Sequence, residues 1–309
     1  MLTSTAVLAQ SQVYFTKEIT PESLVKIYKA LGVEATGRVA VKISTGEGGN
    51  THYLKPTLIR QLVEKVNGTI VECCTAYPGT RMDPKKHWET IHEHGFDSIF
   101  AVDLMDEFGD LRIPAQDHKH LRYNIVGNHL PYYDFMINLA HFKGHAMGGF
   151  GGVMKNASIG VASTAGKCYI HSAGKSSDPK TAWNPGILAA GETQDLFLES
   201  MAAAAQAVHN YFSGRVIYIN VMNNMSVDCD CDGSPAKPEL LDMGIMASLD
   251  PVAVDQACLD MVFNHKGKPG DDNKPLIERI NRQHGTYITD YAQQIGLGSK
   301  TYTLVNLDE

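Results

Sequence analysis

Strands and helices alternate along the first half of this chain. Residues 38–43 (RVAVKI) form a short apolar run typical of a buried strand, and residues 69–73 form a second one. Between them, residues 56–66 carry apolar side chains at helical spacing. Because parallel strands need such a crossover connection, the alternation predicts an α/β fold, with a mixed, mostly parallel sheet and helices on both faces.

The later sequence continues this pattern. We predict helices at residues 84–94, 197–212, 251–263, 275–284 and 289–294, and strands at residues 98–104, 132–139, 215–221, 243–249 and 301–307. Asp250 and Pro251 mark one helix start, because Asp caps helices and Pro favours their first position. A polar stretch over residues 171–193 predicts a long loop. We therefore expect two lobes, residues 1–190 and 191–309, with the site between them, or else one compact unit.

Composition and charge limit the classes of partner. The chain has 309 residues, is 43% hydrophobic and carries a net charge of −7, which argues against disorder, a nucleic-acid groove and an anionic membrane surface. No apolar run could cross a bilayer, and residues 1–10 lack the basic start of a signal peptide, so we expect a cytoplasmic protein. Six cysteines without a Cys-x-x-Cys motif indicate reduced thiols and no iron–sulfur cluster within this chain.

The densest candidate site is residues 141–171, HFKGHAMGGFGGVMKNASIGVASTAGKCYIH. Glycine inside a helix or strand costs roughly 0.5–1 kcal/mol relative to alanine, so another demand must offset that cost. Glycine lets a ligand approach the backbone, Lys supplies a compact charge, and imidazole supplies a proton or a metal-ligating nitrogen. Neither the Walker A pattern nor the dinucleotide fingerprint fits. The segment therefore predicts a pocket wall, with a flexible surface loop as the alternative.

Two further segments carry ligand-type side chains. In residues 228–232 (DCDCD), alternate residues share a face if the segment is extended, so Cys229 and Cys231 could form half of a soft-metal site. The three aspartates could bind a harder metal, and a plain acidic turn with partly buried cysteines is the alternative.

Residues 44–50 (STGEGGN) follow the first strand, where open α/β sheets bind ligands, so Glu47 and Asn50 could orient a ligand or coordinate a cation. An ordinary loop is the alternative there.

The runs HFKGHAMGGFGGVMKN, NVMNNMSVDCDC and ASLDPVAVDQACLD resemble the family called domain of unknown function 362, over nearly the whole chain. Members of that family are often labelled iron–sulfur centre proteins. Many carry a ferredoxin-like cysteine segment that this chain lacks.

His145, Lys155 and His171, spaced around a Gly-Phe-Gly-Gly core, resemble residues of the nickel-pincer lactate racemase family. In that family a lysine is attached covalently to a pyridinium-derived nucleotide cofactor, one histidine ligates nickel, and another is an acid/base group. The resemblance implies that Lys155 is the cofactor-attachment or anion-binding lysine, His171 the metal ligand and His145 the proton-transfer group.

These observations predict an enzyme for a small carboxylate or phosphorylated anion, either a metal- or cofactor-dependent isomerase or racemase, or a redox enzyme. The predicted catalytic residues are His145, Lys155 and His171. The predicted cofactor-binding residues are Glu47, Asn50, Lys143, Gly149, Gly151, Gly152 and Asn156. The predicted ligands of a nickel, zinc or iron ion are His145, His171, Asp228, Cys229 and Cys231. The alternatives are a metal-binding or electron-transfer accessory protein with a redox partner, and a module that binds a small anion without chemistry.

Overall fold

The computed structural model describes residues 10–187 and 193–309. At its centre is an eight-stranded sheet with the order β12-β1-β11-β10-β7-β2-β3-β4. All of its neighbouring strands pair in parallel except β11, which is antiparallel to both β1 and β10. The strands are β1 (Ser11–Thr16), β2 (Val39–Lys42), β3 (Gly68–Glu72), β4 (Val102–Leu104), β7 (Phe135–His141), β10 (Val216–Met222), β11 (Gly244–Ser248) and β12 (Tyr302–Asn306). The expected mixed, mostly parallel α/β sheet is confirmed.

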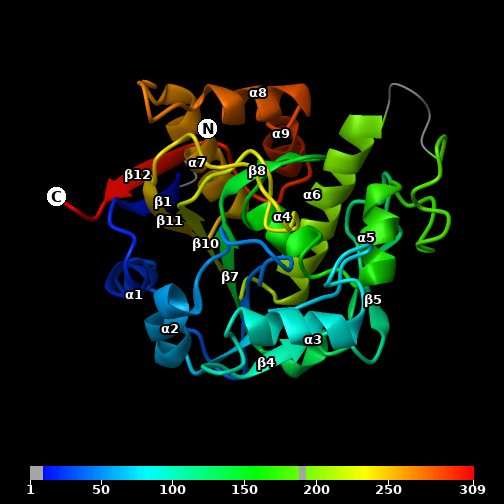
Figure 1. Cartoon of the computed structure of the whole chain (residues 1–309). Coiled ribbons are helices and arrows are strands. Elements are labelled where there is room, and N and C mark those ends of the chain that lie inside the picture. The colour runs from blue at the N-terminus through cyan, green and yellow to red at the C-terminus, as the bar shows by residue number, and fades with distance from the viewer. Residues whose placement is uncertain (1–9, 188–192) are drawn as a thin grey trace, which may run out of the picture.

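Two hydrophobic cores lie on the two faces of this sheet, because successive side chains of a strand point to opposite faces. In β2, Val39 and Val41 belong to one core and Ala40 to the other. The first core is covered by α1 (Pro21–Ala30), α2 (Pro56–Lys65) and α3 (Pro84–Glu93). The second is covered by α4 (Val153–Ser158), α5 (Thr164–His171), α6 (Thr193–Tyr211), α7 (Pro251–Asn264), α8 (Lys274–Arg282) and α9 (Tyr287–Gln294). Figure 1 shows α1 and α2 on one side of the strands and α6 on the other.

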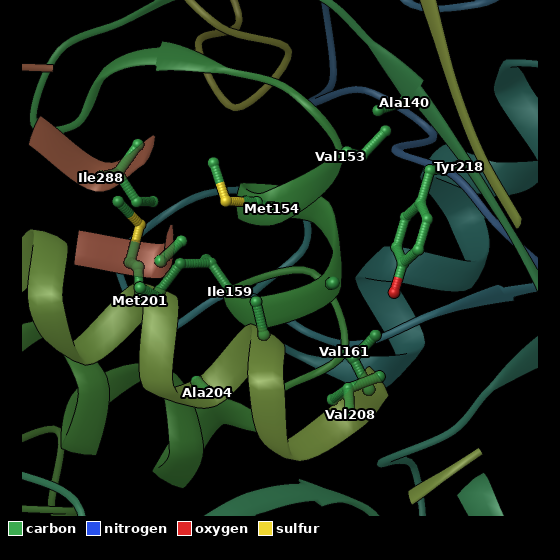
Figure 2. Close-up of a cluster of buried hydrophobic side chains, with 14 of the residues drawn as sticks. Ala140, Val153, Met154, Ile159, Val161, Met201, Ala204, Val208, Tyr218 and Ile288 are labelled. Carbon is green, nitrogen blue, oxygen red and sulfur yellow. The ribbon is translucent and has the colours of Figure 1, made fainter. Parts of the chain in front are cut away.

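The short helix α4 is packed between the sheet and the long helix α6. Figure 2 shows Met154 and Ile159 near Met201 and Ala204 of α6, and all four side chains are buried. Val153 lies on the opposite side of α4, toward Ala140 of β7 (Figure 2). This packing fixes the position of the helix that carries Lys155.

The glycine-rich segment, residues 141–171, is a buried part of the fold. It forms the hairpin β8 (Lys143–His145) and β9 (Gly149–Gly151), followed by α4 and α5. Every residue of β8 and β9 is buried, so the alternative of a flexible surface loop is wrong.

The sequence-based prediction missed several elements. They are β1, α1, α4, α5, the β8–β9 hairpin, the short helix η1 (Leu130–Tyr132) and the hairpin of β5 (Asp110–Pro114) with β6 (Tyr123–Gly127). The strand predicted at residues 98–104 is shorter, Val102–Leu104. The predicted helix start at Asp250 is confirmed, because its carboxylate accepts hydrogen bonds from the N–H groups of Val252 and Ala253 at 2.9 and 3.0 Å.

The boundary predicted between residues 190 and 191 lies outside the described residues, as do residues 188–192 of the loop predicted over residues 171–193. Strands from before and after that point share one sheet, since β1 lies between β11 and β12. The division into two lobes stays a prediction. Within the described residues, every helix is too short or too polar to span a bilayer.

Candidate functional site

A small cavity lies at the carboxyl ends of the neighbouring parallel strands β2, β3 and β7. Lys42, Glu72 and His141 end these strands, and all three line the cavity. Its free volume is about 60 Å³, which is room for a few water molecules or one small anion. Open α/β sheets bind ligands at this edge, so the cavity is the candidate site.

Cations outnumber carboxylates around the cavity. Its cationic lining residues are Lys42, Arg81, Lys143, Lys155 and Lys167, and its carboxylates are Glu72 and Asp230. Glu72 pairs with both Lys42 and Arg81 at 3.1 Å, and Asp230 pairs with Lys143 at 2.8 Å. From outside the lining, Glu47 contacts Arg81 at 3.3 Å. Lys42, Arg81, Lys143 and Lys167 therefore meet three carboxylates, with Lys155 as a fifth basic group, and an anion in the cavity would improve this balance.

Lys155 lines the cavity, and its amine has no hydrogen-bond or ion-pair partner within residues 10–187 and 193–309. Burial, together with the charge of Lys143, lowers the pKa of Lys155 to about 7. Gly151 leaves space beside it, since a Cβ there would lie 3.4 Å from Cδ of Lys155 and 3.6 Å from Cε of Lys143. A neutral amine is an effective base near neutral pH. Lys155 can therefore accept a proton from a bound molecule.

A carboxylate distant in sequence holds Lys155 in place. Asp255 of α7 accepts hydrogen bonds from the N–H groups of Val153 at 2.9 Å and Met154 at 3.0 Å, at the start of α4. Gly152 precedes this turn, and a Cβ there would lie 2.2 Å from Oδ1 of Asp255. Glycine is therefore required for the carboxylate to cap α4 at the turn that contains Lys155.

His145, Cys229 and Cys231 form the group of described residues most suited to hold a metal ion. One nitrogen of His145 and the two sulfur atoms all lie within 4.8 Å of one another. Nδ1 of His145 accepts a hydrogen bond from Gly148 N–H at 2.8 Å, and burial holds the pKa of His145 well below its usual range. The ring is therefore neutral at physiological pH. The two cysteines are joined by a disulfide, so the expectation of reduced thiols is wrong for this pair.

Two predicted metal ligands are placed elsewhere. Nδ1 of His171 donates a hydrogen bond to the Lys167 carbonyl at 2.7 Å, and its ring stacks on Phe197 with centroids 4.6 Å apart. Burial lowers the pKa of His171 to about 4. The carboxylate of Asp228 faces Arg279 at 3.2 Å. The structure therefore brings His145 to the cysteines, but not His171 or the Asp228 carboxylate.

The predicted cofactor-binding residues separate into three groups. Lys143, Gly151, Gly152 and Asn156 line the cavity. Glu47 and Asn50 instead bind the cysteine loop, residues 228–232: Glu47 N–H donates to the Asp230 carbonyl and Asn50 Nδ2 donates to the Asp232 carbonyl, both at 2.7 Å. Gly149 lies against Gly285, where a Cβ would be 2.9 Å from the Gly285 Cα, and it does not line the cavity.

Sequence reasoning missed two of the cations, Lys42 and Arg81, whereas Lys167 lies in the predicted segment 141–171 but was given no role. The sequence could have pointed to Lys42, because it is a charged residue within the apolar strand RVAVKI. Arg81 lies in the loop after β3 and reaches the cavity through Glu47 and Glu72. Nζ of Lys167 donates to the Ala162 carbonyl at 2.6 Å. No local pattern marks Arg81.

Residues 39–260 match the family described as domain of unknown function 362 (DUF362), which confirms the family expected from the sequence. No curated protein matches the chain. Among solved structures, the lactate racemase apoprotein from Thermoanaerobacterium thermosaccharolyticum is 15% identical, with a TM-score of 0.44, over 82% of this chain and 57% of that one. A structural-genomics protein from Thermotoga maritima is 12% identical, with a TM-score of 0.43, over 90% of this chain and 59% of that one. The chain thus spans less than two thirds of either protein, and we assign no residue role from them.

The covalent nucleotide cofactor implied by the lactate racemase resemblance does not fit this cavity. Pockets for ligands of that size have volumes of roughly 300–1,000 Å³, whereas the cavity beside Lys155 offers about 60 Å³.

Proposed function

The chain belongs to the DUF362 family, and for this member we propose an enzyme that removes and returns a proton on a small carboxylate, as an isomerase or racemase does. The observation that carries the proposal is the Lys155 amine, which faces a cation-rich cavity at the carboxyl ends of parallel strands. A phosphorylated small anion would satisfy the same charges.

The arrangement of charge supports this chemistry. Removing a proton from the carbon next to a carboxylate breaks a C–H bond and leaves its electron pair as a second negative charge. Buried cations stabilise such a charge strongly because little water screens them. Lys42, Arg81, Lys143 and Lys167 would surround it, while the proton passes to Nζ of Lys155. Return of that proton from Nζ to the planar carbon completes the reaction, at the same face for simple exchange and at the opposite face, once the intermediate has turned in the cavity, for racemisation.

A second candidate is a module that binds a small anion without changing it. The same excess of cations favours this function, and it needs no base. The two candidates differ only in whether Lys155 exchanges a proton with the bound molecule.

Proton exchange in D₂O separates the candidates. We would incubate the chain with a panel of 2-hydroxy and 2-amino carboxylates and follow the loss of each α-proton signal by NMR. The proposal predicts exchange with at least one carboxylate, loss of exchange in Lys155→Met, and normal exchange in Lys180→Met, which alters an exposed lysine. Binding without exchange would favour the module, and neither binding nor exchange would contradict both candidates.

A further inference from the structure

We propose that Cys229, Cys231 and His145 form a redox-gated site for a soft divalent metal ion such as Zn²⁺. The Cys229–Cys231 disulfide closes the site, and its reduction opens it. This inference does not depend on the role proposed for Lys155.

The donor set and its spacing suit zinc. Two thiolates and one imidazole are soft and borderline ligands that zinc prefers, with metal–ligand distances of about 2.0–2.3 Å. The three donor atoms already lie within 4.8 Å of one another, so once the S–S bond is reduced, shifts of about 1 Å that separate the two sulfur atoms would arrange all three around one ion. Three protein ligands leave one coordination position open, which is the pattern of catalytic rather than structural zinc sites.

The cysteine loop is anchored by contacts other than the disulfide. The Asp230 carboxylate, between the two cysteines, accepts hydrogen bonds from His141 and Lys143 at 2.8 Å each. Asn50 and Arg279 hold the two ends of the loop through Asp232 and Asp228. These contacts do not require the S–S bond, so both sulfur atoms remain beside His145 after reduction.

The hairpin β8–β9 brings His145 against this loop. Gly144 N–H donates to the Ser226 carbonyl at 2.8 Å, just before the cysteine loop. A Cβ on Gly144 would lie 2.2 Å from the Val227 carbonyl oxygen. Only glycine permits the two backbones to approach so closely at this position. This approach places the next residue, His145, near both sulfur atoms.

Both cysteines border two hollows. They line the cavity that contains the Lys155 amine, and also an open hollow formed with Gly48, Thr80 and Gly233. A reductant and a metal ion can approach from the open hollow. A bound ion would then lie at the boundary between that hollow and the cavity.

A dithiol can reduce the Cys229–Cys231 disulfide. The dithiol gives two electrons and two protons to the disulfide, is itself oxidised to a disulfide, and leaves Cys229 and Cys231 as thiols. Binding of Zn²⁺ releases the two thiol protons, because the thiolate is the ligand. In the oxidised chain neither sulfur can become a thiolate, so the ion loses two of its three ligands.

His145 supplies a signature of metal binding. Because Nδ1 accepts the Gly148 hydrogen bond, the neutral ring carries its proton on Nε2. A metal at Nε2 would move that proton to Nδ1, and a metal at Nδ1 would displace Gly148. Either way the Gly148 hydrogen bond is lost, so the amide resonance of Gly148 should shift when the metal binds.

Cobalt(II) is a suitable probe, because thiolate-to-cobalt charge transfer absorbs light only when sulfur ligates the ion. We would titrate Co²⁺ into the full chain before and after reduction with dithiothreitol that is then removed under argon. The reduced chain should bind one ion with this absorption, and the oxidised chain should bind at least 100-fold more weakly. Equal binding by the two forms, or none by the reduced form, would overturn the proposal.

Variants locate the ligands. The double variant Cys229→Ser with Cys231→Ser should abolish the charge-transfer band, and His145→Ala should weaken binding at least tenfold. Cys168→Ser, at a buried free cysteine outside the trio, and Lys180→Met, at an exposed lysine, should bind normally. A test on the unaltered chain does not depend on whether these variants fold: a disulfide-forming oxidant should release bound Co²⁺ and restore the Gly148 amide resonance. Retention of the ion after oxidation would contradict the proposal that the disulfide prevents metal binding.

Discussion

Nζ of Lys143 donates a hydrogen bond to Oδ2 of Asp230 at 2.8 Å, and both side chains are buried. This contact joins the β8–β9 hairpin to the loop that carries both cysteines. Burial alone would raise the pKa of Asp230, but the charges of His141 and Lys143 hold it well below its usual range. The pair therefore connects the cation-rich cavity to the candidate metal ligands through one ionised carboxylate.

Breaking this pair should destabilise the fold strongly. Removing one partner of a buried ion pair leaves an uncompensated charge and costs about 3–5 kcal/mol. We expect Lys143→Met to cost about 3 kcal/mol in urea unfolding, since His141 still contacts Asp230. The double variant Lys143→Met with Asp230→Asn should cost at least about 1 kcal/mol less than the sum of the single variants.

The exposed pair Arg60 and Glu64, 2.7 Å apart on α2, provides the control. Its removal should cost under about 1 kcal/mol, because exposed ion pairs contribute little. If the losses of unfolding free energy in the two single variants simply added up in the double variant, Lys143 and Asp230 would not stabilise each other.

Lys155 should react as an amine with a pKa of about 7. Amine-acylating reagents attack only the neutral form, so labelling of Lys155 should rise with pH and level off above about pH 8. Exposed lysines should continue to rise toward their ordinary pKa near 10.4. Competitive labelling followed by mass spectrometry measures this, and a Lys155 profile that matches the exposed lysines would be inconsistent with the proposed base.

Asp255 should position Lys155 through the start of α4. We expect Asp255→Ala to cost about 2–3 kcal/mol, because it leaves the Val153 and Met154 N–H groups without their acceptor. It should also shift the labelling profile of Lys155. Thr20→Ala removes the side-chain cap of a different helix, α1, and should destabilise the chain without changing that profile. An unaltered Lys155 profile in Asp255→Ala would leave Asp255 with a purely structural role.

Gly144→Ala should destabilise the fold and weaken metal binding by the reduced chain. The new Cβ would lie 2.2 Å from a backbone oxygen that cannot rotate away, and overpacking of this kind costs about 1–3 kcal/mol or more. Gly267→Ala is the milder comparison, because its Cβ first meets a side-chain oxygen of Asn273 at 3.0 Å. Thermal melting and Co²⁺ titration measure the two effects, and equal melting temperatures for these variants would refute the close approach.

His171 should make the fold sensitive to acid. Burial lowers its folded-state pKa from 6.5 to about 4, so the unfolded chain binds the extra proton first as the pH falls. Stability is therefore complete above about pH 6.5 and is lost as the pH falls toward 4, with roughly 2 kcal/mol lost by pH 4.5. His171→Phe should show a correspondingly smaller difference between unfolding free energies at pH 7 and pH 4.5. If the unaltered chain and His171→Phe lost the same stability between pH 7 and pH 4.5, His171 would not be the source of the acid sensitivity.

The sheet was predictable because its strands and crossover helices carry regular apolar spacing. The helices α4 and α5 were not, because they have only six and eight residues and contain few periodic apolar positions. Asp255, about 100 residues later, supplies the cap that α4 lacks locally. A tertiary contact therefore determines where this helix begins, and no local sequence pattern predicts it.

The candidate site was predictable where its residues are close in sequence. Lys143, Gly151 and Lys155 line one cavity because the hairpin and α4 follow each other directly. Arg81 was missed because distant partners, Glu47 and Glu72, place it. His171 was grouped with the site by its place in the glycine-rich segment and by the lactate racemase resemblance, whereas in the structure its ring packs against Phe197.

Calorimetric titration with small anions tests the central claim most directly. We predict that the chain binds one lactate, malate or phosphate ion at pH 6.5, and that Lys155→Met and Lys167→Met each weaken binding at least tenfold while Lys180→Met does not. Because the cavity is buried, salt should weaken this binding only modestly. An absence of binding, or equal affinity in all four chains, would contradict an anion site built around Lys155.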